Sequence, residues 1–368
     1  MKIPAPRVRG ALALATCALA LALTAGCGGD DEPAQSKKGR APSADLGAIK
    51  TYLLDHTTRL EEETGKLRAG AEGYYAMAKA ADFDYDRLLR ENRAEVASFV
   101  KGAQADYRAA NPAYEEMEGV VAGVPELADF DVIIDAGSDA SDPENAVPFS
   151  IKTPGGKTFE QPGNFMFLAE TSAYGTEPRF AAEGVMADLD NDGKVEFGET
   201  VPDADFYVAA MRDFERSAKE LDAAARKYQP TDADALTALV VMTPTMSEYF
   251  GAWKNSRFVS GDKATEKAFV GASRLQDISD ILGGLVLIYE NVEPRIAEAD
   301  SLQARQTGES LKKLRAFADR LRVREAAGTR FTAEQADTLG AEAQGRAEDI
   351  AGQVSQVAAK LDIELEEG

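Results

Sequence analysis

The spacing of apolar residues predicts a chain built from long amphipathic helices. Over most of the sequence, apolar side chains recur at intervals of three, four and seven residues, which is the period of one helix face. The pattern indicates an all-α fold with two antiparallel helical bundles, a long irregular insertion and a single EF-hand-type loop. The predicted helices begin at Asp45 and at about residues 85, 203, 231, 264, 303 and 332.

The only histidine of the chain, His56, falls on the apolar seam of the first predicted helix. The same seam carries Ile49, Leu53 and Leu60. A single histidine in such a seam is more often packed in the core than bound to a metal, because a ligand histidine normally has partners nearby. Both interpretations remain open at this point.

Proline and glycine mark two special places in the later helices. Pro244 should kink the helix predicted over 231–254, which Thr231 or Asp232 would cap. The pair Gly283 and Gly284 lies in the middle of the helix predicted over 264–299. Glycine there permits either a bend or a close approach of another helix.

Residues 120–202 interrupt the helical pattern and form the predicted insertion. Prolines and glycines punctuate 120–187, and the segments 130–134 and 149–151 are expected to be short strands or irregular loop. A weak helix is predicted from about Pro178 to Ala187. Long insertions of this kind are usually functional or form a cap. This one is also rich in carboxylates, namely Asp129, Asp131, Asp135, Asp139, Asp142 and Glu144.

The end of this insertion carries the clearest chemical motif of the chain. In residues 188–199, aspartates stand at loop positions 1, 3 and 5, a glycine at position 6 and a glutamate at position 12. This spacing is that of an EF-hand calcium loop, in which alternate oxygens point inward and the glycine allows a sharp bend. The predicted ligands are Asp188, Asp190, Asp192, Lys194 through its carbonyl, Glu196 through water, and Glu199.

The flanks of the loop favour a structural calcium site over a sensor. Pro202 should interrupt the helix that normally leaves an EF-hand, and no second loop is visible in the sequence. Sensors usually come as paired EF-hands that open a groove. We therefore expect Ca²⁺ to fix the insertion onto the helical bundle.

A second pair of acidic residues lies near the end of the helix predicted over 85–119. Glu115 and Glu118 are three residues apart and project from the same helix face. They could hold a metal ion, and the alternative is a solvated acidic turn. Together with His56 they form the candidate second metal site.

The N-terminal segment reads as a bacterial lipoprotein signal peptide. Residues 1–26 contain a basic start, an apolar run and small residues directly before Cys27. This pattern resembles a lipobox, in which Cys27 is lipidated and becomes the mature N-terminus. Residues 27–45 would then be a flexible tether. The expected location is the extracytoplasmic face of a bacterial cell membrane.

Composition narrows the choice of partners. The formal net charge of −22 makes binding to nucleic acid unfavourable, so we expect no nucleic-acid partner. The sequence shows no zinc-type histidine motif and no serine or cysteine constellation for hydrolysis. We therefore expect no enzymatic activity.

Two helical segments resemble imelysin-like domains of the kind found in EfeO/EfeM iron-uptake proteins. These are residues 114–118 (Tyr-Glu-Glu-Met-Glu) and 273–281 (Ser-Arg-Leu-Gln-Asp-Ile-Ser-Asp-Ile). The resemblance would cover 46–363, with a first helical hairpin at 46–119 and the remaining bundle helices at 203–363. It implies two all-α bundles, an exported lipoprotein and the capture of iron for a membrane permease. The family's Gly-x-His-x-x-Glu motif is missing, since Arg59 stands three residues after His56.

Two functions are consistent with these features. The first is a calcium-binding, membrane-anchored extracytoplasmic lipoprotein that acts as a binding module, with calcium in a structural role. The alternative is an accessory metal-binding protein of an iron-uptake system, with iron as cargo and a metal permease or another envelope protein as partner.

Overall fold

The computed structural model describes residues 43–185 and 187–365, which belong to one compact unit. None of the helices in these ranges combines the length and apolarity needed to cross a membrane. The elements of the first half are α1 (Leu46–Ala80), α2 (Tyr85–Val121), α3 (Ala128–Asp131), the π-helix η1 (Val132–Ala136), β1 (Ser150–Lys152), β2 (Thr158–Glu160), α4 (Phe165–Tyr174) and the 3₁₀ turn η2 (Pro178–Phe180). Those of the second half are α5 (Ala204–Lys227), α6 (Asp232–Met242), η3 (Thr243–Thr245), α7 (Met246–Asn255), α8 (Arg257–Ser260), η4 (Gly261–Lys263), α9 (Arg274–Ala326) and α10 (Ala333–Lys360).

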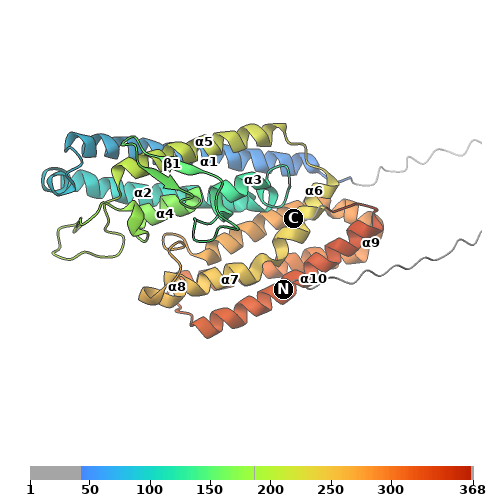
Figure 1. The fold of residues 1–368 in the computed structure, drawn as a ribbon. Helices are drawn as coiled ribbons and strands as arrows, with labels where there is room; N and C mark the ends of the chain where they lie inside the picture. The colour runs from blue at the N-terminus through green and yellow to red at the C-terminus, as the bar shows by residue number, and fades with distance from the viewer. Residues whose placement is uncertain (1–42, 186, 366–368) are drawn as a thin grey trace, which may run out of the picture. The chain divides into compact units, whose positions relative to one another are not determined.

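The long helices form two bundles, as Figure 1 shows. In the first, α1 packs against α2 and α5, and α4 lies against α2 and α5. In the second, α10 packs against α6, α7 and α9. The long helix α9 also contacts α2, so it belongs to both groups. The expectation of an all-α fold is confirmed.

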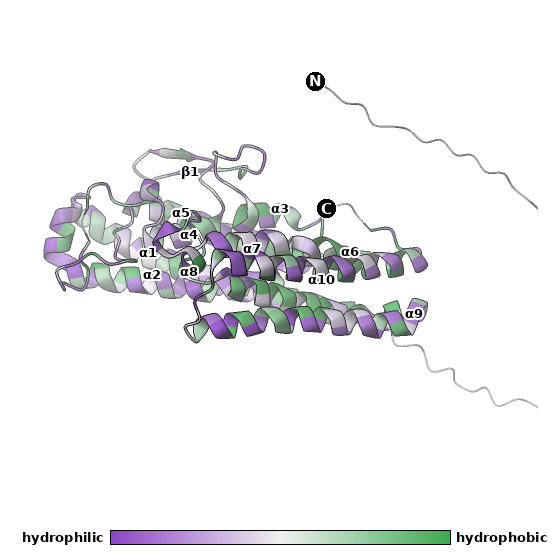
Figure 2. Cartoon of the chain, turned by 90° about the horizontal axis from the view of Figure 1, so that it is seen from below, coloured by the Kyte–Doolittle hydropathy of each residue, from purple (hydrophilic) through white to green (hydrophobic). Residues whose placement is uncertain are grey.

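The predicted apolar seams are the buried faces of these helices. In α1 the residues Ile49, Leu53 and Leu60 are all buried. In α5 the apolar residues spaced by three and four are buried too, namely Tyr207, Met211, Phe214, Ala218, Leu221 and Ala225. One continuous core extends from α1 to α10. Polar and apolar residues alternate along α9 and α10 in Figure 2, as expected of amphipathic helices.

Local signals in the sequence set several helix boundaries. Thr231 caps α6 through a reciprocal capping box with Asp234. Pro244 has a non-helical ψ of 18° and separates α6 from α7, so the predicted kink is confirmed. The predicted break before residue 303 lies at Asp300, whose φ of −160° interrupts α9.

Three local predictions were wrong. Residues 130–134 are helical, forming the end of α3 and part of η1, instead of a strand. The predicted helix over 178–187 is only the turn η2, because the next residues pair with the chain beyond the calcium loop: the Ala182 N–H donates to the Val201 carbonyl at 2.8 Å. The helix predicted from 264 begins only at Arg274, since the backbone N–H groups before it bond to a distant carboxylate described below.

In the insertion, the segment 149–151, expected as a strand or irregular loop, largely forms the strand β1, whereas β2 and α4 were not predicted. The strands β1 and β2 form an antiparallel hairpin in which Ile151 faces Phe159. The helix α4 is capped by the Asn164 side chain and ends at Gly175, which has a φ of +70°. Nearly every side chain of α4 is buried, so the helix shows no amphipathic period.

The glycine pair in α9 gives a matched test of close helix packing. A Cβ on Gly284 would lie 2.4 Å from the backbone oxygen of Glu116 on α2, whereas a Cβ on Gly283 would meet only the mobile end of Arg315 at 3.1 Å. We expect Gly284→Ala to lower the free energy of unfolding by about 1–3 kcal/mol. Gly283→Ala should leave it unchanged or raise it by up to ~1 kcal/mol, because alanine favours helix. Urea denaturation measures both, and equal effects would contradict the close contact.

Candidate metal centre

Glu115 and Glu118 lie side by side in the interior of the protein. Their spacing on α2 places both carboxylates on the face that turns toward α9, and their exposed fractions are 1% and 4%. Asp135 of the π-helix η1 completes the group, with one oxygen from each of the three residues within 4.8 Å of the others. The structure therefore brings together the two predicted glutamates and adds an aspartate from the insertion.

Two further carboxylates, those of Asp131 and Asp277, lie close to this group. Asp131 accepts a hydrogen bond from the Tyr114 hydroxyl at 2.5 Å. Asp277 of α9 accepts one from the Asn111 amide at 2.7 Å, and its exposed fraction is 0%. We call Glu115, Glu118, Asp131, Asp135 and Asp277 the acidic cluster.

One cation reaches the acidic cluster from the start of α9. Arg274 Nη1 lies 3.5 Å from a carboxylate oxygen of Glu115 and 3.3 Å from one of Asp277. Its guanidinium also stacks on Tyr249, 4.3 Å from the ring centroid. A single positive charge is too little to neutralise five carboxylates.

Several oxygens of the cluster lack a hydrogen-bond donor. Both carboxylate oxygens of Glu115 and the Oε2 atom of Glu118 are buried without a donor among the described residues. The Oε1 atom of Glu118 accepts a hydrogen bond from the Tyr249 hydroxyl at 2.7 Å. Buried acceptors without donors are unfavourable, so these oxygens fit a bound cation or retained protons.

The electrostatics of the cluster favour the protonated acids when no cation is present. Burial, with a contribution from Asp135, raises the pKa of Glu118 to about 7. Burial also raises the pKa of Asp277 to about 6, although the neighbouring guanidinium lowers it. The pKa values of Glu115 and Asp131 lie well above their ordinary range, because burial and the neighbouring carboxylates disfavour ionisation. An entering cation would therefore displace protons.

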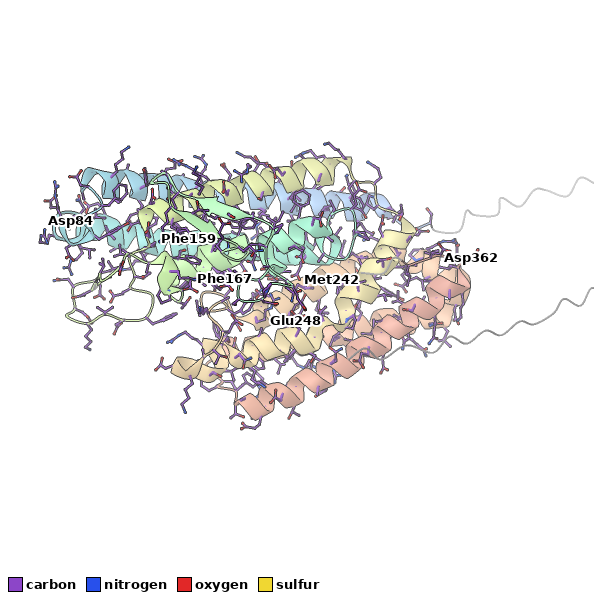
Figure 3. The ribbon with its side chains drawn as sticks, in the orientation of Figure 1. Asp84, Phe159, Phe167, Met242, Glu248 and Asp362 are labelled. Carbon is purple, nitrogen blue, oxygen red and sulfur yellow. The ribbon has the colours of Figure 1, made fainter. Side chains whose placement is uncertain are left out.

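A cavity of about 390 Å³ leads to the cluster. Glu118, Asp131 and Asp135 line its inner wall, and Arg274 and Tyr249 line the side toward α7 and α9. Met242, the last residue of α6, and Glu248 of α7 also line it, and both are labelled in Figure 3.

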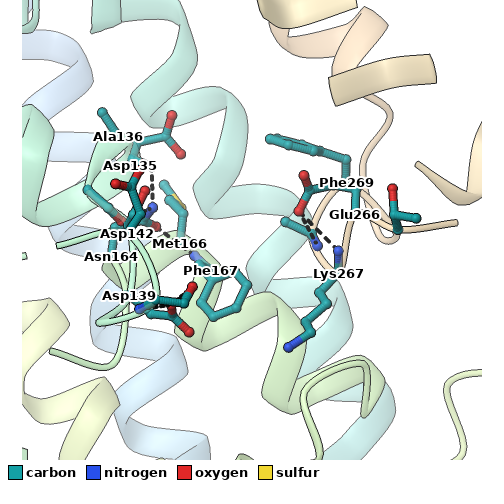
Figure 4. Close-up of a pocket in the computed structure, with 16 residues that line it drawn as sticks. Asp135, Ala136, Asp139, Asp142, Asn164, Met166, Phe167, Glu266, Lys267 and Phe269 are labelled. Atoms are coloured by element: carbon teal, nitrogen blue, oxygen red, sulfur yellow. Dashed lines mark hydrogen bonds between the residues drawn. The ribbon is translucent and has the colours of Figure 1, made fainter. Parts of the chain in front are cut away.

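A second cavity, of about 340 Å³, also reaches Asp135. It is lined by Asp139 and Asp142 of the insertion and by Glu266 and Lys267 of the segment before α9. Figure 4 shows these two segments facing each other across the cavity. Acidic side chains thus line both approaches to the cluster.

His56 is not part of this cluster, and the grouping of His56 with Glu115 and Glu118 is corrected here. Its Nε2 atom lies 2.6 Å from a carboxylate oxygen of Glu116, and its Nδ1 atom lies 2.7 Å from the Tyr52 carbonyl. Burial lowers the pKa of His56, but the bonds to Glu116 and Tyr52 outweigh this and raise it overall. Glu116 follows Glu115 directly and therefore points to a different face of α2.

The calcium loop has the geometry expected of a cation site. One oxygen from each of Asp188, Asp190 and Asp192 lies within 4.8 Å of the others. Gly193, with a φ of +89°, makes the sharp bend, and its N–H donates to Asp188 at 3.0 Å. The donor set of three convergent carboxylates fits Ca²⁺.

The remaining predicted ligands form the closing part of the loop. Glu199 folds back over the loop, with Oε1 accepting from the Leu189 N–H at 3.0 Å and Oε2 from the Glu196 N–H at 2.8 Å. The N–H of Lys194 donates to Asp192 at 2.8 Å. These contacts hold the loop in a closed shape.

The calcium loop joins the insertion to the ends of α1 and α2. The chain after it pairs with the chain before it instead of forming an exit helix, in agreement with the expected effect of Pro202. Leu189 packs in a small apolar cluster with Leu88 and Val96, and Arg93 of α2 donates to the Asp188 carbonyl. The predicted lipidation site Cys27, the signal peptide 1–26 and most of the tether lie outside the described residues.

Sequence comparison supports the resemblance noted above. Residues 181–356 match the family model described as Imelysin (Peptidase_M75). This segment begins just before the calcium loop and includes Arg274 and Asp277, while Glu115, Glu118 and Asp135 precede it. No curated protein matches the chain. The chain therefore carries an imelysin-like domain within an all-α fold.

Proposed function

We propose that this protein is an accessory metal-binding protein of an iron-uptake system, with the acidic cluster as its cation site. Glu115, Glu118 and Asp135 would be the ligands, and Asp131 and Asp277 would complete the negative environment. The observation that carries the proposal is the set of donor-less oxygens on Glu115 and Glu118, which lie deep inside the protein beside Asp135.

The donor set decides which cations suit the cluster. All five side chains offer carboxylate oxygens, which are hard ligands and bind Fe³⁺, Fe²⁺ or Mn²⁺ better than they bind copper(I). The family's iron role supports iron as the cargo. We propose binding without catalysis, because the one histidine is bonded to Glu116 and Tyr52, away from both cavities.

The calcium loop is proposed as a separate, structural site. The convergence of Asp188, Asp190 and Asp192, together with the packing of Leu189 against α2, supports this role. Calcium outside the cell is abundant, so a site of modest affinity would remain filled. The anchor would be a lipid on Cys27, and a metal permease in the same membrane would receive the cargo.

Anaerobic titration with Fe²⁺ in excess Ca²⁺ tests the proposed function, since the calcium loop is then already filled. We expect one Fe²⁺ to bind to the wild-type protein at micromolar concentration or below. The double variant Glu115→Gln, Glu118→Gln should lose at least about 100-fold in affinity, because two charged ligands are removed.

Glu116→Gln is the matched control for this titration. Glu116 lies between the two ligands in sequence but bonds to His56, so its replacement should leave Fe²⁺ affinity within about threefold. Absence of Fe²⁺ binding to wild type, or an equal loss in all variants, would overturn the proposed site.

A further inference from the structure

An irregular segment lines both cavities that reach the acidic cluster. Residues 264–273, here called the strap, connect η4 to α9 and contain no helix or strand. Glu266 and Phe269 of the strap line the 390 Å³ cavity at Glu118. Residues 265–269 also line the second cavity, so the strap forms a wall of both.

The strap continues directly into the residue that covers Glu115. Arg274 follows the strap at the first position of α9, and its guanidinium lies against Glu115 and over the ring of Phe269. Glu118 lines the larger cavity, whereas Glu115 lines neither. A cation in the cavity therefore meets Glu118 and Asp135 directly, whereas Glu115 does not line the cavity and is in contact with Arg274.

A single buried carboxylate fastens the strap. Glu170 of α4 accepts hydrogen bonds from the backbone N–H groups of Phe269 at 2.7 Å, Val270 at 2.9 Å and Gly271 at 2.8 Å. Glu170 has an exposed fraction of 1%. Phe269 has a φ of +53°, which is unusual for a side chain of its size and indicates that these bonds hold the backbone in place.

The strap has further attachments, and those at Lys267 are here called the outer attachments. Lys267 pairs with Glu177 at 2.7 Å, and the Thr176 hydroxyl donates to the Lys267 carbonyl at 2.7 Å. The ring of Tyr174 lies flat against Gly271, where a Cβ would come within 2.5 Å of it. The N–H groups of Thr265 and Glu266 also donate to the Asn255 carbonyl of α7 at 3.1 Å, and Val270 packs in the main core.

We propose that the strap 264–273 is the gate of the buried cation site and that Glu170 is the positioning residue that holds the gate closed. This inference rests on the proposed function. Opening the strap breaks the bonds to Glu170, withdraws Arg274 from Glu115 and exposes Glu115 beside Glu118 and Asp135, which already line the cavity. The closed strap shields the bound cation from water and from competing chelators.

Fe²⁺ release into excess ferrous chelator, followed by stopped-flow absorbance, tests the gate. In Glu170→Gln, one acceptor oxygen becomes an NH₂ group and the charge is lost. We expect release and uptake of Fe²⁺ to become at least about tenfold faster, with Kd changed by less than about threefold, because a gate alters both rates together. Hydrogen exchange at the amides of residues 269–271 should rise in the same variant without any metal.

A milder variant keeps the test independent of folding defects. Lys267→Met combined with Thr176→Val removes only the outer attachments and should accelerate release by about threefold. Lys360→Met is the matched control. It removes an exposed ion pair between Lys360 of α10 and Asp300 of α9. Its release rate should equal that of wild type.

The outcomes separate the gate from the proposed function. If wild type binds no Fe²⁺, the cation site and with it the gate are overturned. If Fe²⁺ binds but its release is unchanged in Glu170→Gln and in the Lys267→Met, Thr176→Val variant, the gate alone is overturned. If Glu170→Gln does not fold, an unchanged release rate in the Lys267→Met, Thr176→Val variant still overturns the gate. Faster release with a proportional loss of affinity would show that Glu170 supports the ligands and is not a latch.

Discussion

The double variant Glu115→Gln, Glu118→Gln is expected to be more stable than wild type at pH 8 when both are free of cations, and equally stable near pH 4. The reason is the raised pKa of the buried acids. Burial raises the pKa of Glu118 to about 7, and it raises that of Glu115 well above its ordinary value. In the unfolded chain both groups ionise at an ordinary pKa near 4.3.

The sign of the pH dependence follows from proton binding. Between about pH 4.3 and pH 7 the folded protein retains protons that the unfolded chain has released, so the free energy of unfolding falls as the pH rises. The difference for Glu118 alone corresponds to about 4 kcal/mol, and Glu115 acts in the same direction. Glutamine cannot ionise, and the double variant should therefore lose this part of the pH dependence.

Urea denaturation in the presence of a chelator, at several pH values from 4 to 8, measures this effect. Glu116→Gln is again the matched control, and its effect on stability at pH 8 should have the opposite sign. Its hydrogen bond to His56 lowers the pKa of Glu116, so its ionised form stabilises the fold and its loss should destabilise the protein at pH 8. A wild-type protein that becomes more stable from pH 5 to pH 8 relative to the double variant would contradict protonated acids in the cluster.

The same cluster illustrates what the sequence could and could not predict. Local spacing placed Glu115 and Glu118 on one helix face, and the period of apolar residues predicted that the long helices have buried faces, as α1, α2 and α5 do. These features depend only on residues close together in the chain. The contribution of Asp135 depends on a π-helix inside a segment rich in glycine and proline, and no periodic signal marks such a turn.

Long-range contacts account for most of the remaining differences. The strap has an apolar and polar pattern compatible with helix, but the carboxylate of Glu170, far away in sequence, binds its backbone N–H groups and replaces the helical bonds. His56 lies one position away from the buried Thr57, and its partner Glu116 comes from α2. The packing of α1 on α2 decides which of Glu115, Glu116 and Glu118 meets the histidine, and the sequence pattern does not encode this packing.

Removal of calcium by a chelator is expected to lower the melting temperature of wild type. The melting temperature of Asp188→Ala should not change when the chelator is added. Ca²⁺ binds only to the folded loop, so at a free concentration 100 times the Kd it would stabilise the protein by about 2.7 kcal/mol. For a domain of this size that corresponds to roughly 3–8 °C in melting temperature. Asp188 is the position whose loss should matter most, because its two oxygens accept from the N–H groups of Asp192 and Gly193 and so shape the loop as well as offering a ligand.

Asp142→Ala is the matched control for calcium removal, since Asp142 is an acidic residue of the same insertion outside the calcium loop. It should keep the full chelator shift seen in wild type. Without the cation, the three carboxylates repel one another and the contact of Leu189 with the ends of α1 and α2 weakens, so hydrogen exchange should increase around residues 189 and 201 before it increases in the bundles. A wild-type melting curve that is indifferent to the chelator would exclude a filled structural site, and a chelator shift retained in Asp188→Ala would place the stabilising calcium elsewhere in the protein.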